Sequence, residues 1–281
     1  MEAREECIVL LDNGSLRPEA VFSLRAIARN LERVLGEKVH PVSLLHSSKI
    51  PAEKLNGLQA ETWRRFLINQ LEEGVSRFRV VPLFFGPSSA IADYLPKVTS
   101  EILASLGIAD ASVQVAKTLL DPASKGEETV ARILEELLIQ KVNTVGPRDC
   151  GVVLVDHGSP LEVVARCRDR VAESLRSRLE GRVAGVIAAS MERREGDEYD
   201  FNEPLLESAL SMALEKSWKR IVLSYLFFSP GRHAGEGGDI DQIVANSEFV
   251  SNGGVVLSAP LVGQSPLLIE LLAERFANSL D

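Results

Sequence analysis

The sequence is poor in histidine, cysteine and aromatic residues, and it has no excess of positive charge. Only 4 of its 281 residues are histidine, 3 are cysteine and 5% are aromatic. The formal net charge is −9 at pH 7, which argues against the broad positive surface that attracts nucleic acids. We therefore expect no nucleic-acid partner, and any polyanionic ligand must be held by local arginine or lysine side chains.

Long apolar runs are also missing. No apolar stretch of the sequence has the length that a membrane-spanning helix needs, and four of the first six residues are charged, unlike a secretory leader. Cys7, Cys150 and Cys167 lack metal-type spacing, so we interpret them as buried apolar residues. These absences predict a cytoplasmic protein with no membrane partner.

What the sequence does have is an internal repeat within a chain that is 45% apolar. Asp-Asn-Gly-Ser at residues 12–15 recurs as Asp-His-Gly-Ser at residues 156–159. Leu-Phe-Phe-Gly-Pro at residues 83–87 recurs as Leu-Phe-Phe-Ser-Pro at residues 226–230. The repeat predicts two similar domains that arose by duplication, residues 1–143 and residues 144–281, with a linker near residues 141–149.

Each half begins with a short, continuously apolar run, which is typical of a parallel strand covered on both faces. Alternating strand and helix patterns follow. We predict strands at residues 7–12, 39–45, 78–85, 112–117, 151–156, 183–190, 220–228 and 254–259. We predict helices at residues 17–36, 60–75, 91–106, 125–141, 160–180, 203–217, 239–247 and 265–279. This alternation predicts an α/β fold with two doubly wound parallel-sheet domains and an active cleft between them.

His157 and His233 are the strongest candidates for chemistry. They follow the first and third strands of the second half, and open parallel sheets bind ligands beyond the carboxyl ends of their strands. Neutral imidazole binds divalent first-row metals and accepts protons near neutral pH. The first half has Asn13 and the region of Ser89 at these positions, so we predict one asymmetric site in the second half.

Carboxylates lie in the long loop at residues 191–204, after the second strand of that half. Glu192 or Glu203 could complete a metal site or take up protons, although acids at a helix start are also ordinary. His46 follows the equivalent strand of the first half, at a position that we match to Ser190 and that could face the cleft.

Arginines could hold a substrate carboxylate through paired hydrogen bonds, although surface arginines are most often solvated. The candidates are Arg232, Arg193 and Arg194. The glycine-rich segment at residues 231–239 has neither a P-loop nor a dinucleotide-binding pattern, so we interpret it as a mobile or close-approach loop. Asp239 is expected to cap the following helix, or else to stand behind the site.

The motifs at residues 156–159, 192–204 and 226–240 together resemble the class II chelatases of the sirohydrochlorin cobalt- and iron-chelatase type. The resemblance implies a lyase that inserts Co²⁺ or Fe²⁺, or Ni²⁺, into a tetrapyrrole during cobalamin or siroheme biosynthesis. It implies that His157 and His233 bind the metal, that Glu192 assists them, and that Arg232, Ser159 and Glu203 contact the tetrapyrrole. The metal would be a substrate, and no organic cofactor is expected.

Two other functions are compatible with the residues. A carrier could bind a tetrapyrrole or metal in the same cleft without turnover. A hydrolase could use Ser159 with His157, but residues this close on a turn seldom reach the required geometry, and the sequence lacks the Gly-x-Ser-x-Gly nucleophile elbow.

Overall fold

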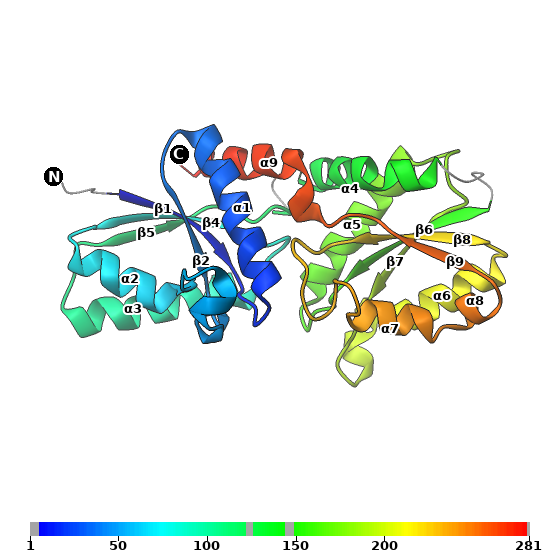
Figure 1. The fold of residues 1–281 in the computed structure, drawn as a ribbon, viewed down its shortest axis with the longest axis horizontal. Helices are drawn as coiled ribbons and strands as arrows, with labels where there is room; N and C mark the ends of the chain where they lie inside the picture. Colours follow the sequence, from blue (N-terminus) through cyan, green and yellow to red (C-terminus); the bar gives the residue numbers. More distant parts are fainter. Residues whose placement is uncertain (1–5, 122–125, 144–148, 280–281) are drawn as a thin grey trace. The chain divides into compact units, whose positions relative to one another are not determined.

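The computed structural model describes residues 6–121, 126–143 and 149–279 (Figure 1). The middle of the predicted linker, residues 144–148, lies outside the described residues. The described chain forms two parallel sheets flanked by helices, which confirms the predicted fold class. None of the helices in these three ranges combines the length and the apolar character needed to cross a membrane.

The first sheet has the strand order β3-β2-β1-β4-β5, with every paired strand parallel. Its strands are β1 (Glu6–Asp12), β2 (Val39–Ser43), β3 (Glu61–Thr62), β4 (Arg77–Pro82) and β5 (Ser112–Val115). The associated helices are α1 (Pro18–Leu35), α2 (Trp63–Glu72), α3 (Leu95–Leu106) and α9 (Pro266–Ala277). Helices α2 and α3 cover one face, while α1 and α9 lie on the other (Figure 1).

The second sheet has the order β7-β6-β8-β9 and is also parallel. Its strands are β6 (Cys150–Asp156), β7 (Val186–Ser190), β8 (Arg220–Tyr225) and β9 (Val255–Ser258). The associated helices are α4 (Gly126–Val142), α5 (Glu162–Arg178), α6 (Leu206–Glu215), α7 (Asp239–Ala245) and α8 (Glu248–Ser251). Every residue of β6 is buried, as expected for a central strand covered on both faces.

Close packing against β6 explains why residue 151 is a glycine. The indole of Trp218 fills the space that a side chain at residue 151 would need, since a Cβ on Gly151 would lie 1.9 Å from the Trp218 ring. The three cysteines are buried, as predicted, and they are not joined by disulfides.

The strand order places the ends of β6 and β8 at a topological switch point. From β6 the chain passes through α5 to β7 on one side, and β8 then leads to β9 on the other side. The carboxyl ends of two such neighbouring strands form the usual ligand-binding crevice of an open α/β sheet. His157 follows β6, and His233 lies in the loop after β8.

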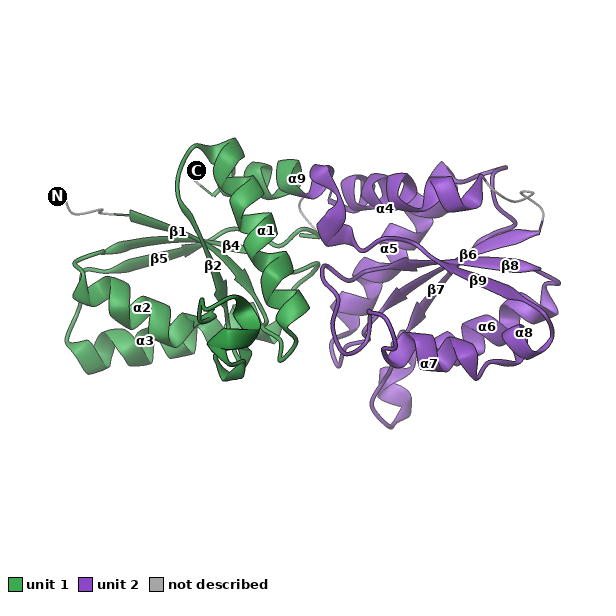
Figure 2. Cartoon of the chain, in the orientation of Figure 1, with its two compact units in different colours: residues 1–121, 269–281 green, residues 122–268 purple. Residues whose placement is uncertain are grey.

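The two compact units differ from the two halves of the repeat (Figure 2). One unit contains residues 1–121 and 269–281, and the other contains residues 122–268. Helix α4, which closes the first repeat, packs against α5 of the second sheet. Most of α9, which closes the second repeat, belongs to the unit of the first sheet. The closing helices of the two repeats are thus exchanged between the sheets.

Several predicted elements differ in detail from the structure. The two-residue strand β3 and the short helices at Ser47–Lys49 and Ala52–Leu55 were not predicted, because runs this short carry no periodicity. The predicted helix at residues 203–217 begins only at Leu206, after a 3-10 helix at Asp197–Asn202. The predicted helix at residues 239–247 is two helices, α7 and α8, separated at Asn246 and Ser247.

Candidate functional site

The structure brings the rings of His157 and His233 together. Their centroids are 4.6 Å apart and their planes make an angle of 78°. The His157 side chain is 47% exposed and that of His233 is 24% exposed, so both remain accessible to a ligand. Two imidazoles from different strand ends therefore face one shared region of the second unit.

Gly158 fixes the turn that carries His157. Its φ of +90° lies in the left-handed region that favours glycine, and a Cβ here would lie 1.9 Å from the carbonyl oxygen of Glu192. The amide of Glu192 donates to the carbonyl of His157 at 3.2 Å. The loops after β6 and β7 are thereby pressed together, and Glu192 is set beside His157.

Each histidine has a carboxylate neighbour. Glu192 Oε1 lies 3.4 Å from His157 Nε2, and Asp239 Oδ2 lies 2.9 Å from His233 Nδ1. The second pair is close enough for an ion pair, but its angle does not make a hydrogen bond. The same Asp239 oxygen is 3.2 Å from Arg232 Nε. Asp239 therefore contacts the Nδ1 side of the His233 ring. Gly238, rather than Asp239, is the N-cap residue of α7.

The described residues contain no preassembled group of three or more histidine, cysteine, aspartate or glutamate side chains that could hold a metal ion. The histidine pair and Glu192 offer nitrogen and oxygen donors without forming such a closed cage. This donor set suits divalent first-row metals.

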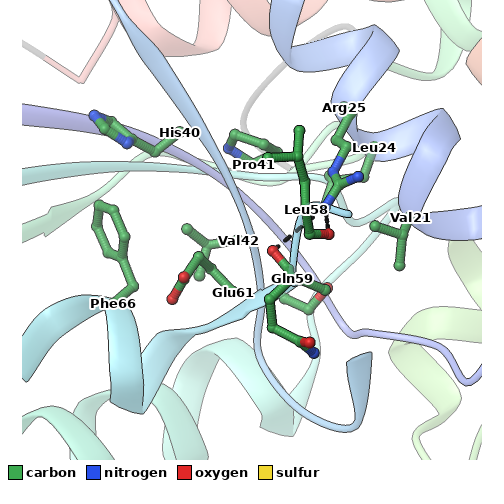
Figure 3. Close-up of a pocket in the computed structure, with 12 residues that line it drawn as sticks. Val21, Leu24, Arg25, His40, Pro41, Val42, Leu58, Gln59, Glu61 and Phe66 are labelled. Carbon is green, nitrogen blue, oxygen red and sulfur yellow. Dashed lines mark hydrogen bonds between the residues drawn. The ribbon is translucent and has the colours of Figure 1, made fainter. Parts of the chain in front are cut away.

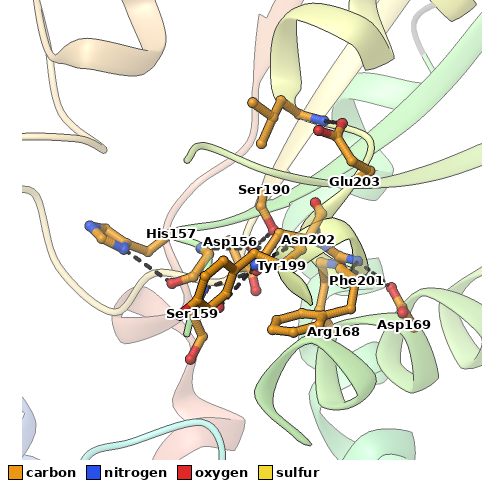
Figure 4. A network of polar contacts seen from close by, with 12 residues as sticks. Asp156, His157, Ser159, Arg168, Asp169, Ser190, Tyr199, Phe201, Asn202 and Glu203 are labelled. Carbon is orange, nitrogen blue, oxygen red and sulfur yellow. Dashed lines mark hydrogen bonds and ion pairs between the residues drawn. The ribbon is translucent and has the colours of Figure 1, made fainter. Parts of the chain in front are cut away.

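Beside His157 lies a buried polar network (Figure 4). Asp156 Oδ1 accepts hydrogen bonds from Ser190 Oγ at 2.6 Å and from the Gly158 amide at 3.1 Å. Burial raises the pKa of Asp156, against the opposing effects of the Ser190 hydrogen bond and the nearby Arg168 guanidinium. The carboxylate ties the His157 turn to the end of β7.

Asn202 extends this network to the far end of the loop. Its Oδ1 accepts from the Ser159 amide at 3.0 Å, and its Nδ2 donates to the Ser159 carbonyl at 2.9 Å. Arg168 donates to the carbonyls of Phe201 and Asn202 and to Ser190 Oγ. Both ends of the 191–203 loop are therefore anchored to the His157 turn.

The remaining predicted residues have more local partners. Ser159 Oγ accepts from the Leu161 amide at 3.1 Å, while His157 Nδ1 faces the Gly158 carbonyl at 3.2 Å. The ring nitrogens of His157 are thus directed at partners other than the Ser159 hydroxyl, which does not favour a serine hydrolase. Glu203 accepts from the Leu205 amide at 2.9 Å and lies 3.5 Å from Arg193 Nε.

The arginines differ in their surroundings. Arg193 pairs with Asp200 as well as Glu203, and Arg194 lies over the Tyr199 ring, 5.8 Å from its centroid. The Arg232 side chain is 77% exposed and pairs with Asp239, whereas that of Arg193 is only 24% exposed.

The first unit has the same tight turn, but it lacks the histidine and the glutamate of the candidate site. Gly14 has a φ of +91°, and a Cβ there would lie 1.8 Å from the carbonyl oxygen of Leu45. Leu45 therefore occupies the place of Glu192, and Asn13 that of His157. The strand register pairs Asp12 with Ser43 as it pairs Asp156 with Ser190. The predicted match of His46 to Ser190 is thus wrong by three residues.

The buried aspartate of the first unit also has different partners. Desolvation raises the pKa of Asp12 to about 6, despite hydrogen bonds from Ser43 and from the backbone of Gly14. In place of Asn202, Ser47 Oγ accepts from the Ser15 amide at 3.1 Å and donates to the Ser15 carbonyl at 3.2 Å.

A separate pocket of about 230 Å³ lies on the first unit (Figure 3). His40, Pro41, Phe66 and Glu61 are among its lining residues. Arg25 at its rim donates to the carbonyls of residues 55, 58 and 59, so it holds the adjoining loop. None of the predicted site residues lines this pocket.

Sequence reasoning missed Ser190, Asn202 and Arg168 as a group that organises the site. Arg168 had a detectable signal: it lies on the apolar face of its helix, three residues from both Ala165 and Val171. A charged residue at such a position needs buried partners.

Comparisons with known proteins identify similar sequences and similar folds. Residues 151–279 match the family model described as CbiX. The chloroplastic sirohydrochlorin ferrochelatase of Arabidopsis thaliana is 27% identical over 140 residues, which are 50% of this chain and 56% of the plant protein. The chain therefore matches little more than half the length of that relative.

Solved structures share the fold over nearly the whole chain. SirB from Bacillus subtilis with Fe³⁺ has a TM-score of 0.69 at 17% identity and covers 98% of this chain and 95% of its own. CbiX, described as the terminal enzyme of siroheme biosynthesis in denitrifying bacteria, has a TM-score of 0.60 at 16% identity and covers 98% and 100%. Residues 151–279 thus match the CbiX family, and the resemblance of the chain to the class II chelatases is confirmed.

Proposed function

We propose that the protein is a sirohydrochlorin chelatase that inserts a divalent metal ion into the tetrapyrrole. The observation that carries the proposal is the pairing of the His157 and His233 rings at 4.6 Å, at the switch point of the second sheet. The match of this same segment to the CbiX family supports it, as does the plant relative named as a sirohydrochlorin ferrochelatase.

In this proposal the two histidines hold the incoming ion, and the Glu192 carboxylate contacts it beside His157. His157 Nε2 and Glu192 Oε1 are 3.4 Å apart, and two donor atoms bound to one ion at about 2.1 Å lie about 3 to 3.5 Å from each other. His233 Nδ1 faces Asp239, which leaves Nε2 as its metal-binding atom. A small, open set of ligands suits an ion that must be released into a macrocycle.

Metal insertion also displaces two pyrrole N–H protons. His157, His233 and Glu192 are the groups in the site that can act as bases toward these protons. We assign the helper role to Glu192 rather than Glu203, because the Glu203 carboxylate already accepts the Leu205 amide and lies beside Arg193.

The carboxylates of the tetrapyrrole require positive partners. Arg232 is exposed beside His233 and is the first candidate. The Ser159 hydroxyl accepts from the Leu161 amide and retains its own hydrogen to donate to the substrate. Co²⁺ and Fe²⁺ are the proposed metal substrates, with Ni²⁺ a third, and the reaction belongs to siroheme or cobalamin biosynthesis in the cytoplasm.

An absorbance assay tests this function. Purified protein is mixed with sirohydrochlorin and a panel of Co²⁺, Fe²⁺, Ni²⁺ and Zn²⁺, and the tetrapyrrole spectrum is followed against the rate without protein. We expect accelerated metallation with Co²⁺ or Fe²⁺. Binding of tetrapyrrole and metal with no acceleration by any ion would instead identify a carrier.

A further inference from the structure

Arg168 is a fully engaged arginine inside the second unit. Only 2% of its surface is exposed, although it lies on α5 among apolar neighbours in the helix sequence. A buried guanidinium is costly unless its charge and its N–H groups are paired. The partners of Arg168 therefore indicate the role of this side chain.

One partner is the neighbouring Asp169 of the same helix, whose Oδ1 lies 2.8 Å from Arg168 Nη2. The other partners come from the segments that build the candidate site. Arg168 donates to Ser190 Oγ at the end of β7, and to the carbonyls of Asn202 at 3.0 Å and Phe201 at 3.1 Å. It also lies 4.0 Å from Asp156, the residue before His157. One side chain thus joins the His157 turn to both ends of the loop that carries Glu192 (Figure 4).

The first unit supplies an internal comparison. The residue 144 positions before Arg168 is Leu24, which is buried. The turn at Gly14 has nearly the same geometry as that at Gly158. An arginine at this helix position is therefore not needed to build the turn, and it accompanies the two histidines and Glu192. The next residue of α1, Arg25, binds the carbonyls of Leu55, Leu58 and Gln59 instead.

We propose that Arg168 is a positioning residue, which sets the separation of His157 and Glu192 and through it the affinity of the site for a divalent ion. This inference rests on the proposed function, because it assumes that these two side chains bind the ion together. Lysine cannot replace arginine here, since it lacks the planar fork that reaches two carbonyls and a hydroxyl at once.

The test measures Co²⁺ binding directly, by titrating the full-length protein and following the visible absorption of the bound ion. Arg168→Lys keeps the buried charge, and Arg168→Leu copies the first unit. The control is Arg178→Leu, at the far end of the same helix, where the arginine pairs with Glu135. Circular dichroism verifies that each variant is folded.

We expect both Arg168 variants to bind Co²⁺ at least about tenfold more weakly than the wild type, and Arg178→Leu to bind within about twofold of it. In turnover, Arg168→Lys should raise KM for the metal more than it lowers kcat. Should Arg168→Leu fail to fold, Arg168→Lys alone decides.

Folded Arg168→Lys protein with wild-type Co²⁺ affinity would overturn the positioning role and leave the chelatase proposal intact. Failure of the wild-type protein to metallate sirohydrochlorin, despite Co²⁺ binding that depends on Arg168, would overturn only the chelatase proposal. A wild-type protein that binds no Co²⁺ overturns the positioning role as stated.

Discussion

Glu192 and Glu203 lie near the two ends of one loop, but their surroundings give them different roles. Glu192 is 65% exposed and points at His157. Glu203 accepts the Leu205 amide at the start of α6. A carboxylate beside a metal-binding imidazole can receive a proton, while one engaged with a helix start chiefly stabilises the helix.

Glu192→Gln should therefore lower the rate of metal insertion by about 10²-fold or more, the usual range for loss of a general base. Glu203→Gln should keep the rate within a few-fold and lower the melting temperature slightly. Both rates are measured by metallation of sirohydrochlorin at saturating metal. The reverse order of effects would assign the helper role to Glu203.

Asp12 is a residue whose burial should be visible in the pH dependence of stability. Its pKa in the folded protein is about 6, above the usual 3.8, because burial disfavours the charged form. The folded state therefore retains a proton that the unfolded chain has lost. Stability contributed by this proton is complete below pH 3.8 and is lost as the pH rises through 6.

Asp12→Asn removes this dependence. Between pH 4 and pH 8 the free energy of unfolding of the wild type should fall by about 3 kcal/mol relative to the variant, the equivalent of the pKa rise. Urea denaturation at several pH values measures the difference. Parallel pH profiles for the two proteins would show that Asp12 is not protonated in the folded state.

At this scale the sequence allowed the proximity of His157, His233 and Glu192 to be predicted, because strand ends converge at one edge of a parallel sheet. The place of Arg168 on an apolar helix face indicates that it needs buried partners, but the helical pattern does not tell which residues those partners are. Asp239 was predicted mainly as a helix cap, and its place behind His233 depends on the path of the preceding glycine-rich loop.

At the scale of elements, the turn after the first strand of each repeat joins two loops at a distance that only glycine permits. Gly158 and Gly14 have nearly equal φ values and equally close backbone neighbours. The two turns therefore form a matched pair, one with the candidate site and one without it.

Gly158→Ala and Gly14→Ala should each destabilise the protein by about 1–3 kcal/mol, because both force an L-residue into a left-handed, crowded position. Only Gly158→Ala displaces Glu192 from His157, so only this variant should lose Co²⁺ affinity. Thermal unfolding and Co²⁺ titration measure the two effects. Equal loss of metal affinity in both variants would contradict a site confined to the second repeat.

Eight strands were located by their apolar runs, although most end earlier than predicted. The predicted strand at residues 220–228, for example, ends at Tyr225, where parallel pairing with β6 stops and the loop toward His233 begins. Apolar composition continues into such loops because they pack against the sheet edge. Periodicity alone therefore does not mark the last paired residue.

At the scale of the whole molecule, the duplication and the compact units divide the chain differently. The residues of α9 are anchored in the first unit by Arg79, whose guanidinium lies 3.4 Å from the centroid of the Phe276 ring and donates to the Phe276 carbonyl at 2.9 Å. Arg275 donates to the carbonyls of Thr118 and Leu119. The sequence repeat predicts α9 and α4, but an amphipathic helix does not specify which of two similar sheets it covers.

This exchange predicts opposite patterns of hydrogen exchange for two core variants. Phe276→Ala, in α9, should lower the free energy of unfolding by about 3–5 kcal/mol. It should increase amide hydrogen exchange mainly in β1 and β4. Leu138→Ala, in α4, should lower the free energy of unfolding by about 2–5 kcal/mol. It should increase amide hydrogen exchange mainly in β6 and β8. Mass spectrometry after deuterium labelling measures both. If each variant instead increased hydrogen exchange in the sheet of its own repeat, the swapped packing of α4 and α9 would be contradicted.

The most direct test of the central claim is the rate at which Co²⁺ or Fe²⁺ enters sirohydrochlorin, compared between histidine variants and a matched control. The wild type and Asn13→Ala should metallate the tetrapyrrole at similar rates, because Asn13 occupies the His157 position in the repeat that lacks the site. His157→Ala and His233→Ala should each fall to the rate without protein. Wild-type rates in either histidine variant would contradict a site built on the paired imidazoles.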